Sequence, residues 1–251
     1  MTPIEKAELL RRLHVDPELL VLVNVWDAAT AKEVAAAPGC RAIATASHSI
    51  ANSFGYPDGE QIPADTMLDM VGRIAAAVDL PVTADLEAGY GDPAATVRKA
   101  IALGVVGANL EDQMRPLAES VAAVEKVIRA AEGEGVPFVL NARTDAYLLA
   151  GDRDRDEVLR DAIERGRGFL DAGADCVFVP GRLDADTIRA LVEGIGTLKV
   201  SVIGLPGLPS QEELAAIGVA RISYGPRPQA VVLEALAETA SELLGGGSLP
   251  D

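Results

Sequence analysis

Short runs of apolar, largely β-branched residues recur along the whole chain, and each is bounded by Gly, Pro or Asp. Eight of them have the length and composition of buried strands. The predicted strands are Leu20–Val25, Arg41–Ala46, Pro81–Asp85, Val105–Glu111, Pro137–Ala142, Asp175–Val179, Leu198–Ile203 and Val219–Ser223. Because Ala, Val, Leu and Ile dominate them, we expect parallel strands that are covered on both faces.

Helical patterns lie between these strands. Apolar residues spaced three and four apart predict helices over Met67–Val78, Ser120–Ala131 and Asp156–Leu170, and a final helix over Gln229–Leu244. Glycines are expected to end helices just before the next strand, because Gly adopts the left-handed cap conformation freely. These glycines are Gly39, Gly104, Gly133, Gly173 and Gly218.

Eight strand–helix units without a change in composition predict a single (β/α)8 TIM barrel, in the α/β class, over residues 1–251. Residues 1–19 would add an N-terminal helix before the barrel, and residues 245–251 (GGGSLPD) would form a flexible tail. Such barrels commonly have about 250 residues. An open, doubly wound sheet is the alternative, but no GxGxxG or GxxxxGK[ST] motif follows the first strand.

Composition narrows the possible partners. Hydrophobic residues make up 49 % of the chain and aromatics only 4 %, so we expect an aliphatic core. The formal net charge of −16 argues against nucleic acid as a partner, since phosphate binding needs clustered Lys and Arg. No uncharged apolar stretch reaches 18 residues and no signal peptide is evident, so we expect a cytoplasmic protein that does not enter a membrane. The isolated Cys40 and Cys176 are interpreted as small buried hydrophobes.

Acidic residues stand at the ends of three neighbouring predicted strands, where a barrel carries its chemistry. Asp58 lies on the loop after the second strand, Asp85 and Glu87 end the third, and Glu111 ends the fourth. Alternation along a strand would point Asp85 and Glu87 to the same side. Converging carboxylates repel one another unless a cation or a shared proton lies between them. A hard divalent cation with oxygen ligands fits this pattern, so we expect Mg²⁺, with Mn²⁺ as a possible substitute.

Arg143, at the end of the fifth strand, faces this acidic cluster. Its guanidinium could clamp a substrate carboxylate, or it could simply neutralise the cluster through ion pairs. We expect a backbone or loop role for His48 rather than general-base catalysis, and a solvated side chain for His14.

Some of the polar residues at strand ends have a structural alternative, because Asp and Ser often cap the helix that follows. Asp92, Asp154 and Ser210 fit that role well. For Asp112 and Asp145 capping is also the favoured interpretation.

At these residues the chain resembles the isocitrate lyase and phosphoenolpyruvate mutase superfamily. The run ADLEAGYGD is similar to the superfamily signature D-x-[DE]-x-G-[YFW]-G. Six further segments match in the same order, over about Leu20 to Glu238. They are NVWDAATA, TASHSIANSFGYPDG, GANLED, NARTDAY, GADCVFVPG and GVARISYGP.

The resemblance implies a role for each matching residue. Asp85 would be the direct Mg²⁺ ligand, and Asp58, Glu87 and Glu111 would hold water molecules around the ion. Arg143 would bind the substrate carboxylate, and Ser47 and His48 would contact it through backbone amides, with Asn141 completing the substrate site. Arg143, Glu111 and Asp58 are thus the expected catalytic residues. The implied chemistry makes or breaks a C–C or P–C bond beside an α-keto carboxylate, through an enolate.

The sequence differs from the superfamily at the loops whose residues distinguish one reaction of the superfamily from another. Lyases carry KKCGH on the loop after the fourth strand, and mutases carry a Lys and an Asn or Thr there. This chain continues from NLED directly into QMRPLAES, which offers only Gln113 and Arg115. Mutases also carry a His after the sixth strand, where this chain has Pro180.

Three functions remain open on this basis. The first is a Mg²⁺-dependent lyase or decarboxylase of a small 2-oxo or 2-hydroxy di-acid such as oxaloacetate, with the enolate protonated by water, Tyr90 or Tyr224. The second is a phosphonomutase-like enzyme that acts on a carboxyphosphonate or phosphonopyruvate. The third is a non-catalytic ligand-binding member. The resemblance implies an oligomer, since members of the superfamily are usually tetramers and often exchange the last helix between subunits. We therefore expect a homo-oligomer, a dimer or a tetramer, with or without that exchange.

Overall fold

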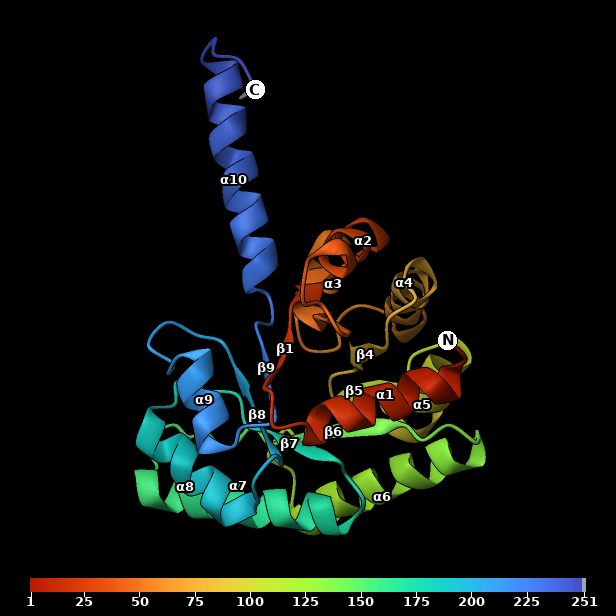
Figure 1. The fold of residues 1–251 in the computed structure, drawn as a ribbon, viewed down its shortest axis with the longest axis vertical. Coiled ribbons are helices and arrows are strands. Elements are labelled where there is room, and N and C mark those ends of the chain that lie inside the picture. The colour runs from red at the N-terminus through yellow and green to blue at the C-terminus, as the bar shows by residue number, and fades with distance from the viewer. Residues whose placement is uncertain (250–251) are drawn as a thin grey trace.

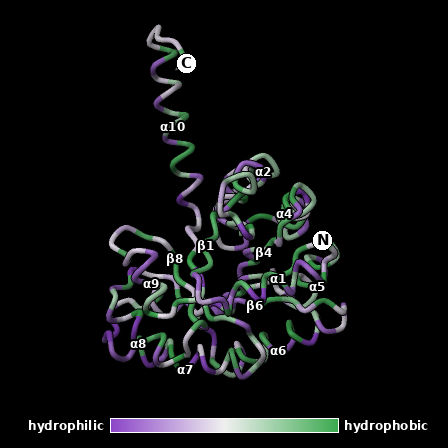
Figure 2. The backbone as a smooth tube through the Cα atoms, in the orientation of Figure 1, coloured by the Kyte–Doolittle hydropathy of each residue, from purple (hydrophilic) through white to green (hydrophobic). Residues whose placement is uncertain are grey.

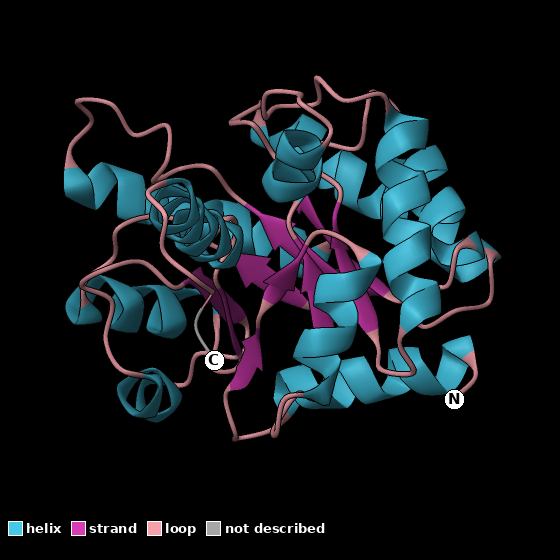
Figure 3. Cartoon of the chain, turned by 90° about the horizontal axis from the view of Figure 1, so that it is seen from above, coloured by secondary structure: helices cyan, strands magenta, loops and turns pink. Residues whose placement is uncertain are grey.

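The computed structural model describes residues 1–249, and its centre is a nearly closed barrel of parallel strands. Figure 3 looks onto the sheet and shows helices around the strands. The prediction of an α/β barrel is therefore confirmed. The strands are β1 (Leu20–Leu22), β2 (Asn24–Val25), β3 (Ile43–Thr45), β4 (Val82–Asp85), β5 (Gly107–Glu111), β6 (Val139–Arg143), β7 (Cys176–Phe178), β8 (Val200–Ile203) and β9 (Arg221–Ser223).

The barrel closes through its first strand, which is interrupted at Val23. One half, β1, pairs with β9 in the register Leu20↔Arg221. The other half, β2, pairs with β3 in the register Asn24↔Ala44. The single predicted strand Leu20–Val25 thus pairs with β9 through its first half and with β3 through its second half. The remaining strands pair with their neighbours in chain order.

Helices surround the strands in the order in which they occur in the chain, as Figure 1 shows. They are α1 (Pro3–Val15), α2 (Ala28–Ala36), α3 (Ser47–Ser53), α4 (Ala64–Ala77), α5 (Pro93–Ala102), α6 (Leu117–Gly133), α7 (Arg155–Asp171), α8 (Ala185–Ile195), α9 (Gln211–Ile217) and α10 (Arg227–Leu244). Asp92, Asp154 and Ser210 accept hydrogen bonds from the first turns of α5, α7 and α9, so their predicted capping roles are confirmed.

Gly133 is the last residue of α6, so the predicted helix end is confirmed, and the positive φ that follows falls on Gly135. One prediction for the caps was wrong. Asp112 and Asp145 cap no helix, since α6 and α7 begin after Pro116 and Asp154.

The N-terminal helix α1 packs against residues of the strands and forms one end of the core. Its Leu10 and Leu13 are buried with Leu20 and Leu22 in one apolar cluster. Gly107 makes room for it, because a Cβ there would lie only 2.7 Å from the Leu10 side chain.

His14, on the same helix, is 2 % exposed rather than solvated, which contradicts the sequence prediction. Its Nδ1 lies 2.8 Å from the Leu10 carbonyl oxygen. Burial, together with the nearby Arg221 guanidinium, lowers the pKa of His14 to about 3, so the ring is neutral.

The last helix, α10, stands off the body of the barrel in Figure 1, and Figure 2 shows hydrophobic stretches along it. Gln229 is its buried residue, and Gln229 Nε2 donates to the Ser49 carbonyl at 2.9 Å. Apolar residues further along are 47–62 % exposed: Val231, Val232, Leu233 and Leu236. The predicted flexible tail begins after Leu244; its residues 250 and 251 lie outside the described residues.

Across residues 1–249, no helix combines the length and the apolar character that crossing a membrane requires.

Candidate active site

The carboxyl ends of the strands surround a cavity of about 390 Å³. Its lining includes five of the residues expected at the site, which lie far apart in the sequence. The lining residues are Asn24, Ser47, His48, Asp58, Asp85, Asn109, Arg143, Leu148, Phe178, Pro180, Gly181, Ile203, Leu205, Ser223, Gly225, Pro226 and Arg227.

Asp85 is the last residue of β4, and its carboxylate is held in place on one side only. Its Oδ2 accepts a hydrogen bond from Ser47 Oγ at 2.8 Å and a longer one from the Ser47 amide at 3.3 Å. Its Oδ1 is buried and has no hydrogen-bond partner among the described residues. A buried acceptor without a partner costs about 1–3 kcal/mol, more when it is charged, so this atom is suited to a bound cation.

Glu87 lies two residues further on, in the turn that follows β4. The strand ends at Asp85 and Glu87 has a φ of 51°, so this turn places it, rather than the alternation along a strand that the sequence suggested. Its carboxylate accepts hydrogen bonds from the Tyr90 hydroxyl at 2.7 Å and from the Glu60 amide. Burial raises the pKa of Glu87, and the charges of Asp85 and Asp58 add to that rise.

Arg143 joins two buried carboxylates at the end of β6. Its Nη1 lies 2.8 Å from Glu111 and its Nε donates to Asp145 at 2.7 Å. The ion pairs with neighbouring acids, which were the alternative role predicted for Arg143, are therefore present. Arg143 also lines the cavity, and its Nη2 donates no hydrogen bond to another group within residues 1–249, so this donor remains for a substrate.

Glu111 ends β5, and its side chain is only 12 % exposed. Burial raises its pKa to about 7; the Arg143 charge opposes this rise, and the Asp145 and Asp85 charges add to it. Glu111 therefore titrates near neutral pH in the protein without metal.

Asp58 and His48 stand at the mouth of the cavity, with the Asp58 carboxylate 3.4 Å from His48 Nδ1. Both side chains are about half exposed. Asp58 is close enough to act electrostatically on Glu87, so the structure brings the predicted acids into one neighbourhood.

Within the described chain, no three acidic, histidine or cysteine side chains come close enough to ligate one ion directly. This agrees with the usual Mg²⁺ arrangement of one or two direct carboxylates completed by waters. The free Oδ1 of Asp85, with Glu87, Glu111 and Asp58 around it, therefore fits a hydrated divalent cation.

Asn141 lies below the cavity rather than in its lining, as part of a polar layer inside the barrel. Its Nδ2 donates to Asn109 Oδ1 at 2.8 Å, and Arg221 Nη2 donates to the same oxygen at 3.2 Å. Arg221 is 1 % exposed, and burial lowers its pKa to about 10. Asn109 and Arg221 were not among the expected site residues, although both stand in segments that carry the resemblance, GANLED and GVARISYGP.

The two tyrosines that the sequence suggested as proton donors, Tyr90 and Tyr224, make hydrogen bonds outside the cavity. Neither Tyr90 nor Tyr224 lines the cavity. The Tyr90 hydroxyl donates to Glu87, and burial beside that carboxylate raises the pKa of Tyr90. The Tyr224 hydroxyl accepts from Gln211 Nε2 at 2.9 Å.

Asp112 forms a buried ion pair with Arg165 behind the site, at 3.0 Å. Asp112 Oδ1 also accepts from the amides of Met114 and Asp145, so it fixes the short turn after β5 and the start of the loop after β6. This supporting role replaces the predicted capping role.

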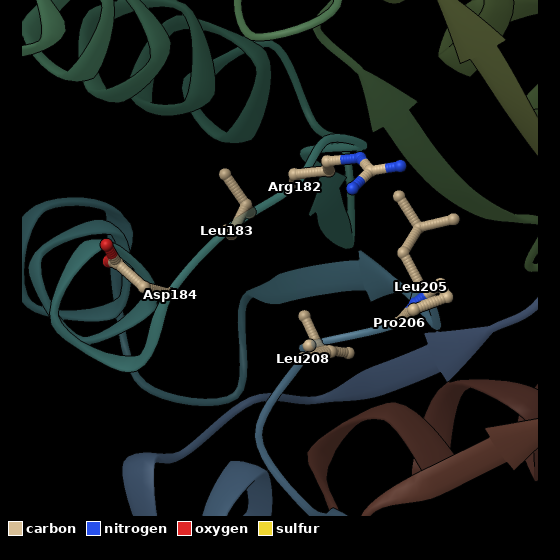
Figure 4. Close-up of a pocket in the computed structure, with 7 residues that line it drawn as sticks. Arg182, Leu183, Asp184, Leu205, Pro206 and Leu208 are labelled. Atoms are coloured by element: carbon tan, nitrogen blue, oxygen red, sulfur yellow. The ribbon is translucent and has the colours of Figure 1, made fainter.

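A second hollow of about 200 Å³ adjoins the cavity and shares Leu205 with it. Figure 4 shows its lining, in which the Arg182 guanidinium lies on the side of Leu205. The other lining residues are Leu183, Asp184, Pro206, Gly207 and Leu208.

Comparison with known proteins gives one family for nearly the whole chain. The sequence model of phosphoenolpyruvate phosphomutase matches residues 10–244. An oxaloacetate decarboxylase of Rhodopseudomonas palustris is 33 % identical, over 78 % of this chain and 70 % of its own length. A 2-methylisocitrate lyase of Shewanella oneidensis is 30 % identical, over 74 % of this chain and 68 % of its own.

Among solved structures, a provisionally assigned phosphonomutase from Burkholderia cenocepacia superposes with a TM-score of 0.89. It is 40 % identical, and the match covers 94 % of this chain and 99 % of the other.

Proposed function

Because the chain belongs to the phosphoenolpyruvate phosphomutase family, a group of lyases and mutases that act on small acids, we propose that it is a Mg²⁺-dependent lyase or decarboxylase. Its substrate would be a small 2-oxo or 2-hydroxy di-acid, and the reaction would pass through an enolate intermediate. The supporting observation is the pairing, across one cavity, of the free Oδ1 of Asp85 with the free Nη2 of Arg143.

The bound cation would supply Lewis-acid stabilisation of the negative charge that develops on the keto oxygen. Asp85 would hold it directly, and Asp58, Glu87 and Glu111 would hold the waters around it. Mn²⁺, which takes similar oxygen ligands, would be a substitute.

Arg143 would bind and orient the substrate carboxylate through Nη2, while Glu111 and Asp145 keep its guanidinium in place. The Ser47 amide and hydroxyl already donate to Asp85, so Ser47 would act by positioning that carboxylate. The His48 amide, in the first turn of α3, would contact the substrate oxygen, since amides at a helix start favour negative charge.

Decarboxylation suits this site better than reactions that need an acid at the cleaved carbon. The short turn after β5 brings no cysteine or lysine to the cavity lining, and neither tyrosine reaches it. Water would then protonate the enolate carbon. The similarity to an oxaloacetate decarboxylase adds support for carbon–carbon chemistry.

A panel of 2-oxo and 2-hydroxy di-acids, assayed with Mg²⁺, tests this proposal. We expect turnover of at least one of them, abolished by EDTA and by Asp85→Ala. Asp69→Ala, on the exposed face of α4, is the matched control and should behave like the native protein. Full activity in Asp85→Ala, or no turnover across the panel, would contradict the proposal.

A phosphonomutase-like reaction is the second candidate, because a provisionally assigned phosphonomutase is 40 % identical. Phosphorus NMR of phosphonopyruvate or a carboxyphosphonate incubated with the protein distinguishes it from C–C cleavage. Mg²⁺ binding without any turnover would instead favour the third candidate, a non-catalytic member.

We also propose a homo-oligomer, a dimer or a tetramer, in which α10 packs against another copy. The support is the apolar surface of α10, which leaves the barrel and is half exposed or more at Val231, Val232 and Leu236.

A further inference from the structure

The lining of the cavity combines polar and apolar residues. The polar ones include the charged groups described above, Asp85 and Arg143 among them. Five apolar ones, here called the wall, lie at the ends of β7 and β8 and on the loops that follow β6, β7 and β8. The wall consists of Leu148, Phe178, Pro180, Ile203 and Leu205.

A four-carbon di-acid leaves this wall without a partner. Such a molecule has polar groups at nearly every carbon. Burying a carboxylate against aliphatic side chains costs free energy, because the carboxylate loses its hydrogen bonds with water and gains none in exchange. The cavity volume of about 390 Å³ lies within the range of small-molecule pockets, about 300–1,000 Å³, near its lower end. The wall therefore fits a part of the substrate that is apolar.

The wall residues differ in exposure. Phe178 is 6 % exposed and belongs to the core as well, whereas Leu148 is 49 % exposed on the loop after β6 and can be covered by a bound apolar group. Pro180 is buried and brings no polar side-chain group to the cavity. Leu205 continues the apolar surface into the adjoining hollow, where Figure 4 shows Leu208 and Pro206 beyond it.

We infer that the substrate carries an alkyl substituent of several carbons, which packs on Phe178, Ile203 and Leu205 while Arg143 holds its acid head. The inference rests on the proposed function, because that function places the acid head. It narrows the substrate class from small di-acids in general to those with an apolar branch or chain. Leu148 would close over that chain and Pro180 would keep the wall free of polar groups.

Calorimetric binding of unbranched 2-oxo acids in the presence of Mg²⁺ tests this inference without requiring turnover. The series runs from pyruvate through 2-oxobutanoate and 2-oxopentanoate to 2-oxohexanoate, with oxalate as a probe of the head site alone. Each methylene that reaches the wall should tighten binding about fourfold, the usual gain from burying a CH₂ group. We expect this gain in at least two consecutive steps of the series.

Leu148→Ser and Leu205→Ser should reduce the gain, because each places a hydroxyl in the wall. Both residues lie on loops, so these variants should fold. We expect each to weaken 2-oxohexanoate binding at least threefold more than pyruvate binding. Leu149→Ser is the matched control, since Leu149 neighbours Leu148 in sequence, is 58 % exposed and does not line the cavity.

The outcomes separate the two ideas. If oxalate and pyruvate bind with Mg²⁺ but affinity stays flat along the series, the inference is overturned and the proposed function stands. An equal effect of Leu148→Ser and Leu149→Ser would likewise overturn it. If no acid in the series binds with Mg²⁺, the proposed function fails and the inference falls with it.

Discussion

Replacing Glu111 with Gln should stabilise the metal-free protein at neutral and alkaline pH, and less so at acidic pH. The Glu111 side chain is 12 % exposed, and burial raises its pKa from the usual 4.5 to about 7. A carboxyl whose pKa is higher in the folded than in the unfolded chain stays protonated up to a higher pH in the folded chain. Its ionisation therefore destabilises the fold as the pH rises from 4.5 through 7.

The magnitude follows from the size of this shift. At 1.36 kcal/mol per pH unit, moving the pKa from 4.5 to about 7 costs about 3 kcal/mol once Glu111 is ionised. Gln has nearly the same shape and no charge, so Glu111→Gln avoids this cost. In a protein of this size, about 3 kcal/mol corresponds to roughly 6–12 °C in Tm.

The assay is urea or thermal unfolding in EDTA at pH 5, 6, 7 and 8, for the native protein, Glu111→Gln and Glu132→Gln. Glu132 lies on the exposed side of α6 and controls for the loss of one negative charge. The stability difference between Glu111→Gln and the native protein should be about 1 kcal/mol at pH 5 and grow to about 3 kcal/mol by pH 8. Parallel pH curves for those two proteins would refute the reasoning.

Three further predictions follow from other contacts. Arg143→Lys should raise KM for the proposed substrate about 10–100-fold in steady-state kinetics, because an ammonium cannot hold Glu111, Asp145 and a carboxylate together; an unchanged KM would contradict a role in substrate binding. Arg165→Leu should lower the free energy of urea unfolding by about 3–5 kcal/mol, since it leaves the Asp112 charge buried and unpaired, and a loss below 1 kcal/mol would contradict this. Leu236→Glu should reduce the molar mass measured by light scattering if α10 packs against another copy; a native protein that is already monomeric would exclude that packing.

Much of the candidate site was predictable because a barrel fixes where strand ends meet. Asp85 and Arg143 end the third and fifth predicted strands, and both line the same cavity. Their convergence required only the order of the strands and the rule that parallel strands end on one side. Asp92, Asp154 and Ser210 were likewise predictable, because capping is a local interaction within four residues.

Other features depend on contacts between distant segments. His14 has the sequence surroundings of an exposed helix residue, yet α1 packs it into the core near Arg221, more than 200 positions away. Glu87 follows the strand pattern in sequence, but the strand ends at Asp85 and a left-handed turn sets its direction. Asp112 resembles a cap and instead pairs with Arg165, whose approach depends on the packing of α7.

The sequence by itself determined the barrel, the order of its elements and the acids around Asp85, because hydrophobic periodicity and strand order are properties of the chain. Only the tertiary structure decided which oxygen of Asp85 is free, which nitrogens of Arg143 bind Glu111 and Asp145, and that apolar residues line the same cavity. Phe178, Ile203 and Leu205 look like ordinary core residues in sequence. Burial and hydrogen bonding are shared among segments far apart in the chain, so the chemistry of this cavity follows from packing rather than from any single motif.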